Sequence, residues 1–423
     1  MATINDKAKQ TILLQGGRLI DPQLNLDEPG DVLIKEGRIA AIGAILAQEA
    51  SEVFPAKGLI ICPGLVDMHV HFRSPGEEQK EDLASGSAAA AAGGFTAVAC
   101  EPNTHPILDS GVMVRQLIEK ANLQSHIYLY VKGCLTLAGQ GDAVVDVAEM
   151  KAYGACALSS DGDPVEDPAV MKTALAECRK HGLLPTLHEE ASGRLPLTEN
   201  SHLREPELVR RDVLLAAENR SPVHFSHIST VAAVETIRLA KLHGMAISAE
   251  VTPHHLSLCA EDAPFGNANF KVNPPLRSRT DREAMKKALA TGIIDCIATD
   301  HAPHTPDEKA AGYEAAPFGV IGLETSLGVV LTELYHTGMM SLQQIITAMS
   351  VKPRKLLSLP EVQLAEGFPA DITLFDPDLE WPVDPQRFHS KGRNCPFAGR
   401  LLKGRAIATI VAGRSAMKYG EIT

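Results

Sequence analysis

Eight short apolar runs alternate with helical patterns between residues 59 and 304, and each run ends in polar residues. Strand and helix alternating eight times over this length is typical of a closed (β/α)8 TIM barrel rather than an open sheet. Such barrels carry their catalytic side chains at the carboxyl ends of the strands. The runs are LIICPGLVDMHVHF, FTAVACEPNT, HIYLYVKGCL, GACALSSDG, LLPTLHEE, PVHFSHIST, MAISAEVTPHH and IIDCIATDHAPH.

The segments between the runs have the features of amphipathic helices. In EDPAVMKTALAECRKHG, Asp167 can cap a helix that begins at Pro168, and Gly182 can end it. In STVAAVETIRLAKLHG, the cap is expected at Ser229 or Thr230.

The two ends of the chain have a different pattern. Residues 11–58 and 370–419 contain strands joined by Gly-rich turns, without a helix between them. We therefore expect one small β-sandwich domain built from both termini, with the barrel inserted between its halves. The expected boundaries are residues 1–58 with 355–423 for the β domain, and residues 59–354 for the barrel.

Charge and cysteine usage narrow the class of protein. The net charge is −12, and no cluster of Lys and Arg could follow a phosphate backbone, which argues against nucleic acid as a partner. The eight cysteines are scattered with no CxxC pair, as expected of free thiols in a reducing cytoplasm. The N-terminus is polar and no run reaches ~18 apolar residues, so we expect no membrane segment.

The polar ends of the runs supply side chains that can bind a divalent metal. Residues two apart on a strand point to the same side, so His69 and His71 can face one ion. Imidazoles and carboxylates converging on a barrel mouth are the ligand set of zinc or a similar divalent metal. The other candidates at strand ends are Asn103, Asp161, His188, His227, Asp300 and His304.

For the remaining histidines, the sequence gives less reason to expect a metal-binding role. His224 is expected to be structural, and His301 to lie behind the metal ligands. His254 and His255 follow the seventh run and can line the mouth. Core or surface positions are expected for the histidines away from strand ends, namely His105, His126, His181, His243, His336 and His389.

A metal with a nearby carboxylate is suited to hydrolysis. The metal lowers the pKa of a water and polarises a carbonyl, while the carboxylate moves the proton. Asp300 is the expected proton shuttle. Arg73 offers a bidentate fork for a substrate carboxylate, with a surface ion pair as the alternative. The long polar segment 304–319 can act as a lid.

Several motifs occur in the order and spacing of the amidohydrolase superfamily, and the chain closely resembles its longer, class I bacterial dihydroorotases over almost its entire length. The resemblance implies reversible cyclisation of N-carbamoyl-L-aspartate to L-dihydroorotate in de novo pyrimidine (UMP) biosynthesis, with one or two zinc ions per subunit. The motifs are DMHVHFRSPG, EPNTHP, SSDGDPV, HEE, HFSHIST, VNPPLR, ATDHAPH, PFGVIGLET, GFPADITLFDP and NCPFAGRLLKG.

The resemblance also implies roles for individual residues. His69, His71 and Asp300 would hold the more buried zinc ion, and His188 and His227 a second one. Asp300 would act as general acid and base. The substrate would be bound through its carboxylate and ring by Arg73, Asn103, His304, Asn273 and the backbone of Pro317 and Gly319.

Two positions depart from the family pattern. Relatives usually carry two consecutive aspartates where this chain has Ser160 and Asp161, and one of them bridges the metals. Either Asp161 is the bridge, or the second metal is weakened or absent. Glu101 stands where methionine is common, and it adds negative charge near an anionic substrate unless its side chain faces away.

Two other functions are compatible with parts of this pattern. Hydantoinases, dihydropyrimidinases and allantoinases share the barrel, but typically bridge their metals with a carbamylated lysine on strand four, and GACALSSDG has no lysine. A non-catalytic homologue that scaffolds aspartate transcarbamoylase commonly loses the HxH motif, which this chain keeps at His69 and His71. An active, homo-oligomeric enzyme that also binds the transcarbamoylase fits the sequence as well.

Overall fold

The computed structural model describes residues 11–45, 47, 50–190 and 203–423, and parallel strands form a barrel within them. The third barrel strand is divided at Lys132 into β8 and β9. Pairing of Val70 with His301 joins the last strand region to the first, so the predicted barrel is confirmed. Its strands are β6 (Leu65–Val70), β7 (Phe95–Cys100), β8 (Tyr128–Val131), β9 (Gly133–Cys134), β10 (Ala157–Ser159), β11 (Leu184–Leu187), β12 (Val223–Phe225), β13 (Ile247–Val251) and β14 (Cys296–Ile297).

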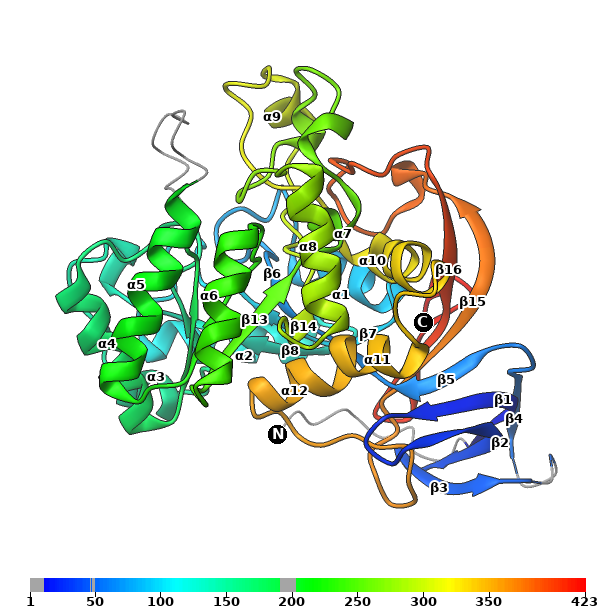
Figure 1. Ribbon diagram of the computed structural model, residues 1–423. Helices are drawn as coiled ribbons and strands as arrows, with labels where there is room; N and C mark the ends of the chain where they lie inside the picture. Colours follow the sequence, from blue (N-terminus) through cyan, green and yellow to red (C-terminus); the bar gives the residue numbers. More distant parts are fainter. Residues whose placement is uncertain (1–10, 46, 48–49, 191–202) are drawn as a thin grey trace.

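Helices surround the barrel, as Figure 1 shows. Two of them begin where the sequence predicts: Asp167 caps α4 and Thr230 caps α6, and Gly182 ends α4 in the left-handed conformation. The helices are α1 (Leu83–Ala92), α2 (Gly111–Gln124), α3 (Val147–Ala152), α4 (Pro168–His181), α5 (Arg204–Asn219), α6 (Val231–Leu242), α7 (Pro253–Ser257), α8 (Arg279–Ala290), α9 (Pro306–Ala310), α10 (Leu323–Val330), α11 (Leu342–Ile346) and α12 (Lys352–Leu356).

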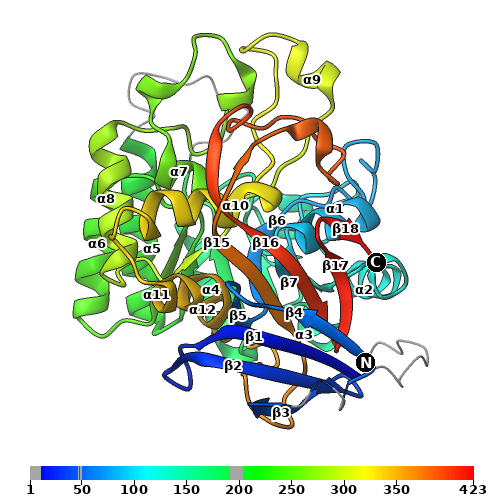
Figure 2. The ribbon, with the colours of Figure 1, turned by 90° about the vertical axis from the view of Figure 1, so that its right-hand side faces the viewer.

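Strands from both ends of the chain form one sheet, nine-stranded within the described residues. The two ends meet where β15 pairs with β5, placing Ile372 opposite Pro63. Both views place this sheet's β1–β3 at one end of the molecule and α9 at the other (Figures 1 and 2). The domain boundaries given above stay a prediction. The strands are β1 (Thr11–Asp21), β2 (Leu26–Lys35), β3 (Arg38–Gly43), β4 (Glu52–Pro55), β5 (Ile60–Pro63), β15 (Ile372–Pro382), β16 (Leu401–Val411), β17 (Arg414–Lys418) and β18 (Glu421–Ile422).

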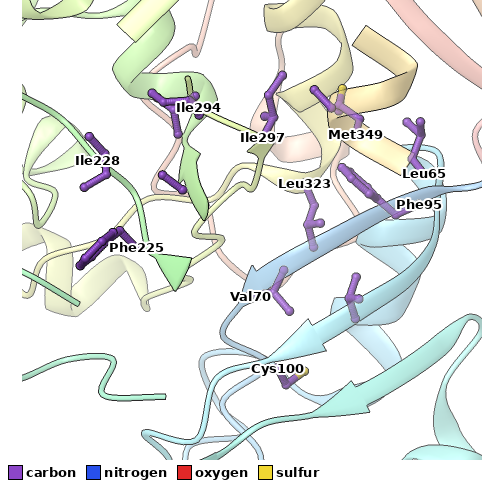
Figure 3. Close-up of a cluster of buried hydrophobic side chains, with 14 of the residues drawn as sticks. Leu65, Val70, Phe95, Cys100, Phe225, Ile228, Ile294, Ile297, Leu323 and Met349 are labelled. Atoms are coloured by element: carbon purple, nitrogen blue, oxygen red, sulfur yellow. The ribbon is translucent and has the colours of Figure 1, made fainter. Parts of the chain in front are cut away.

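The main apolar core lies between the barrel strands and the helices around them. Figure 3 shows part of it, with Val70 and Cys100 on neighbouring strands and Leu323 and Met349 on the helical side. Strands covered in this way are buried on both faces, which explains why their sequences read as continuous apolar runs. None of the described helices is long and apolar enough to cross a membrane.

Candidate active site

The six predicted ligands lie together at the carboxyl ends of the barrel strands. His69 lies on β6 and His71 directly follows it, Asp161 follows β10, and Asp300 follows β14. Nε2 of His69 lies 3.2 Å from Oδ1 of Asp161 and 3.6 Å from Oδ1 of Asp300. Nε2 of His71 lies 3.0 Å from the same Asp300 oxygen. The structure therefore brings these four side chains to one point.

Asp161 lies between this group and a second pair of histidines. Its Oδ1 is 3.5 Å from Nδ1 of His188 and 3.5 Å from Nε2 of His227, while Oδ2 is 3.5 Å from Nε2 of His71. The two histidine nitrogens are themselves 2.9 Å apart. One carboxylate thus faces both histidine sets, which is the arrangement that a bridge between two metal ions requires.

The donor set fits a divalent metal. Nε2 of His69 is buried and has no hydrogen-bond partner among the described residues, although two carboxylates lie beside it. A buried polar atom without a partner is costly, and a metal ion would satisfy this one. Ligand atoms lie within 4.8 Å of one another in two groups at the mouth: His69, His71 and Asp300, and His69, Asp161 and His227.

The backbone turns sharply where several of these residues lie. Arg73, His227 and Asp300 have φ values of 56°, 31° and 49°, a region that residues other than glycine rarely adopt. Such conformations cost about 1–3 kcal/mol each and collect at functional sites. Strand β12 ends at Phe225, so strand alternation does not decide the direction of His227.

Glu250 and His224, which the sequence did not assign to the site, support His69 on the Nδ1 side of its ring. Nδ1 of His69 lies 2.7 Å from Oε1 of Glu250, and the other oxygen of Glu250 lies 3.1 Å from Nε2 of His224. A carboxylate on the far nitrogen of a histidine fixes its tautomer and aims the other nitrogen at a metal. His224 therefore contributes to this support, and Glu250 had one signal in the sequence, a charge inside an apolar strand.

Ser160 and Asn103 position the ligands around Asp161. The Ser160 hydroxyl accepts a hydrogen bond from the His188 backbone N–H at 3.1 Å. Nδ2 of Asn103 donates to Oδ2 of Asp161 at 2.8 Å, and its Oδ1 lies 2.9 Å from Nδ1 of His71. Both polar atoms of the Asn103 side chain thus contact metal-site residues; Nδ2 has a second N–H, and its contact with a substrate carboxylate stays a prediction.

Arg73 and His304 lie together beside the ligand cluster. Nη2 of Arg73 is 3.2 Å from Nε2 of His304. Burial and the charge of Arg73 lower the pKa of His304 to about 3, so the imidazole is neutral at neutral pH. On the other side of the mouth, Nδ2 of Asn273 lies 3.2 Å from Nε2 of His188.

Pro317 and Gly319 lie behind His304, in the segment predicted as a lid. The Pro317 carbonyl accepts from Nζ of Lys309 at 2.8 Å, and the Gly319 N–H donates to the Lys271 carbonyl at 2.9 Å. Gly319 has a φ of 123°, and a Cβ there would approach Cβ of Ala302 to 2.7 Å, which explains glycine at this position. A cavity of about 270 Å³ borders His304, Lys309 and Arg393 on this side.

Three further histidines, His301, His254 and His255, are buried near the site. His301 is buried behind Asp300, with Nε2 3.2 Å from Oε2 of Glu81, as predicted for a residue behind the ligands. His254 and His255 are buried in α7. Burial lowers the pKa of His254 to about 4, and its Nε2 has no partner within the described part of the chain.

The charges of the cluster keep Asp300 ionised. Burial alone would raise the pKa of Asp300, but the hydrogen bond with His71 and the charge of His69 hold it at about 2. An ionised carboxylate in contact with two ligand histidines can accept a proton from a reacting group.

Comparison with known proteins identifies a family and close relatives in sequence. A family model described as the amidohydrolase family matches residues 60–416. The chain is 44% identical over 421 residues to a dihydroorotase of Pelotomaculum thermopropionicum, covering 96% of this chain and 98% of that protein. It is 42% identical to a dihydroorotase of Citrifermentans bemidjiense, covering 95% and 98%, and 41% identical to one of Geobacter sp. (strain M21), covering 97% and 100%.

Solved structures share the fold over nearly the full length. The L-hydantoinase (dihydropyrimidinase) from Arthrobacter aurescens has a TM-score of 0.89 at 25% identity, covering 98% of this chain and 97% of that one. The dihydropyrimidinase from Brevibacillus agri has a TM-score of 0.86 at 22% identity, covering 98% and 96%. The second likeness is one of fold alone.

Proposed function

This chain belongs to the amidohydrolase family, and from that premise we infer that it is a metal-dependent cyclic amidohydrolase with dihydroorotase activity. Its reaction is the reversible cyclisation of N-carbamoyl-L-aspartate to L-dihydroorotate, a step of de novo pyrimidine biosynthesis. The substrate is a small anionic molecule.

The observation that carries this proposal is the carboxylate of Asp161 at the end of β10, facing both histidine sets. Hydantoinases share the fold but need a lysine at the corresponding strand for their bridge, and β10 (Ala157–Ser159) is followed by Ser160 and Asp161 instead. The site therefore supports a dihydroorotase over a hydantoinase or allantoinase. The intact HxH motif and the assembled ligand set argue against a scaffold without activity.

We propose zinc as the metal, held by His69, His71 and Asp300 with a second ion at His188 and His227, and Asp161 between them. When bound, the metal lowers the pKa of the reacting water and polarises the ring carbonyl. In ring opening, Asp300 accepts the proton of the attacking water and donates it to the ring nitrogen that leaves. In ring closure the same carboxylate takes the proton from that nitrogen as it attacks the substrate's side-chain carboxylate, and returns the proton to the carboxylate oxygen that leaves.

The remaining residues are proposed to bind and orient the substrate. Arg73 presents its guanidinium to the substrate carboxylate, with neutral His304 as a second donor. Asn273 and the backbone of Pro317 and Gly319 would lie along the ring. Asn103 acts here through His71 and Asp161, whose orientation it fixes.

The direct test is a paired measurement on the purified protein. We expect bound zinc by mass spectrometry and loss of the dihydroorotate absorbance band when the protein is added. Bound metal with no ring opening would move the assignment to another cyclic amide, and absence of both would favour a scaffold for aspartate transcarbamoylase.

Arg73→Lys is expected to raise KM for dihydroorotate by about 10- to 100-fold with a smaller change in kcat. Lysine keeps the charge but loses the bidentate fork, so binding of the carboxylate weakens in the ground state and the transition state alike. Steady-state kinetics measure this. The same change at Arg238, which is exposed on α6, is the control. An unchanged KM would assign the carboxylate to other donors.

We also propose a cellular compartment and two associations for this protein. All eight cysteines lie among the described residues and are free thiols, which is what a reducing cytoplasm favours. A homo-oligomer and a complex with aspartate transcarbamoylase are compatible with an active enzyme. Light scattering of the protein, alone and with added transcarbamoylase, would test both associations.

A further inference from the structure

A buried ion pair lies inside the barrel, directly beneath the metal ligands. Glu101 follows β7, and Lys132 lies between β8 and β9. Both side chains are 0% exposed, and Nζ of Lys132 donates to Oε1 of Glu101. The same Nζ lies 3.3 Å from the Thr186 hydroxyl on β11. Glu101 therefore does not face the substrate, and its negative charge has a buried partner.

This pair adjoins the histidine that both metal groups share. Nδ1 of His69 lies 2.7 Å from Oε1 of Glu250 but 3.7 Å from Oε1 of Glu101. With Nε2 on a metal ion, His69 has one N–H left to donate, at Nδ1, and two carboxylates compete for it; the distances show that Glu250 accepts it. Lys132 holds the nearer Glu101 oxygen outside hydrogen-bond range of His69.

Stability alone gives little reason for this arrangement. Replacing both members of a buried ion pair by apolar residues is often neutral or stabilising, whereas removing one member leaves a buried charge without compensation. Burial alone would lower the pKa of Lys132, but the charges of Glu101 and Glu250 raise it above its usual value, so the ammonium stays charged. Its position next to the support of His69 points to a role in the metal site.

We propose that Lys132 and Glu101 are positioning residues for the metal centre. Their ion pair keeps Glu101 away from Nδ1 of His69, so that Glu250 alone orients this imidazole and Nε2 points at the metal. This inference rests on the proposed metal-dependent function. It explains how the chain carries a glutamate at position 101 without disturbing the ligand set.

The test is a double-mutant cycle of Lys132→Met, Glu101→Met and the combined variant. Zinc affinity of the metal-free proteins is measured by competition with a chromophoric chelator, alongside ring opening and thermal unfolding. Each single variant is expected to bind zinc at least about tenfold more weakly. In Lys132→Met, Glu101 turns to His69; in Glu101→Met, Lys132 turns to Glu250. The combined variant is expected to return to within about twofold of the parent.

Lys241→Met is the matched control, because Lys241 forms an ion pair with Asp295 (2.5 Å) before β14, at the other end of the barrel. It is expected to change thermal unfolding but not zinc affinity. Parent-like zinc affinity in Lys132→Met, or a combined variant as weak as the sum of the singles, would overturn the proposal.

A variant that fails to fold, and a parent without dihydroorotase activity, can each be told apart from failure of this proposal. If Lys132→Met does not fold, Glu101→Gln keeps the shape of the pair and removes its negative charge, and parent-like zinc affinity in that variant also overturns the proposal. If the parent binds zinc without opening dihydroorotate, the cycle still tests the pair, and only the dihydroorotase assignment fails.

Discussion

Asp300→Asn is expected to abolish both ring opening and ring closure while the fold stays intact. An amide of the same shape keeps the contacts of the side chain but cannot accept and return a proton. General acid–base catalysis contributes up to about 10⁴-fold, so a loss of at least about 10³-fold, or ~4 kcal/mol in barrier height, is expected.

Steady-state rates in both directions measure this loss, with zinc content and circular dichroism taken on the same samples. Asp378→Asn makes the same change at an exposed position of β15 and should leave the rate unchanged. Activity of Asp300→Asn within about tenfold of the parent, a barrier change of only ~1.4 kcal/mol, would mean that another group moves the proton.

Asp161→Asn is expected to lower the zinc stoichiometry and to reduce kcat/KM at least about a hundredfold. Burial would raise the pKa of Asp161, but the charge of His69 and the hydrogen bonds with His188 and His227 lower it well below its usual value. The carboxylate is therefore ionised, with Oδ1 beside His69, His188 and His227 and Oδ2 beside His71. An amide has one oxygen and no charge, and even changes in the supporting shell of a metal cost 10- to 100-fold.

Two variants separate the bridge from its neighbour. Ser160→Ala removes only the hydrogen bond to the His188 backbone and should keep the parent's zinc stoichiometry. Adding Ser160→Asp to Asp161→Asn supplies a carboxylate one residue earlier. Recovery of zinc and activity in that double variant would show that a carboxylate one residue earlier can replace Asp161; if Asp161→Asn keeps both, Asp161 is not the bridge.

The sequence was sufficient to predict the barrel and the grouping of the ligands, because both depend on periodicity. Eight apolar runs require a closed parallel barrel, and its geometry brings His69, His188 and Asp300 to one mouth from distant parts of the chain. The grouping of His71 with Asp300 around one ion was implied by the family resemblance.

Details beyond the strand ends could not be predicted, because alternation stops where the strands stop. Arg73, His227 and Asp300 lie on turns with positive φ, whose direction depends on tertiary contacts. His224 was expected to be structural, and its contact with Glu250, the carboxylate behind His69, depends on the packing of neighbouring strands. Glu101 and Lys132 lie in different runs, so their pairing required the three-dimensional arrangement of neighbouring strands.

Because a ribosome makes the chain from its N-terminal side, neighbouring strands of the terminal sheet become available for pairing at different times. Strand β5 leaves the ribosome before the barrel strands do, but its neighbour β15 begins only at Ile372, opposite Pro63. Until then one side of β5 has unpaired backbone groups, a template for pairing with other chains. The whole barrel is synthesised in that interval. The nascent chain therefore carries an open edge while the barrel is being made, and that edge is a surface that a chaperone could cover.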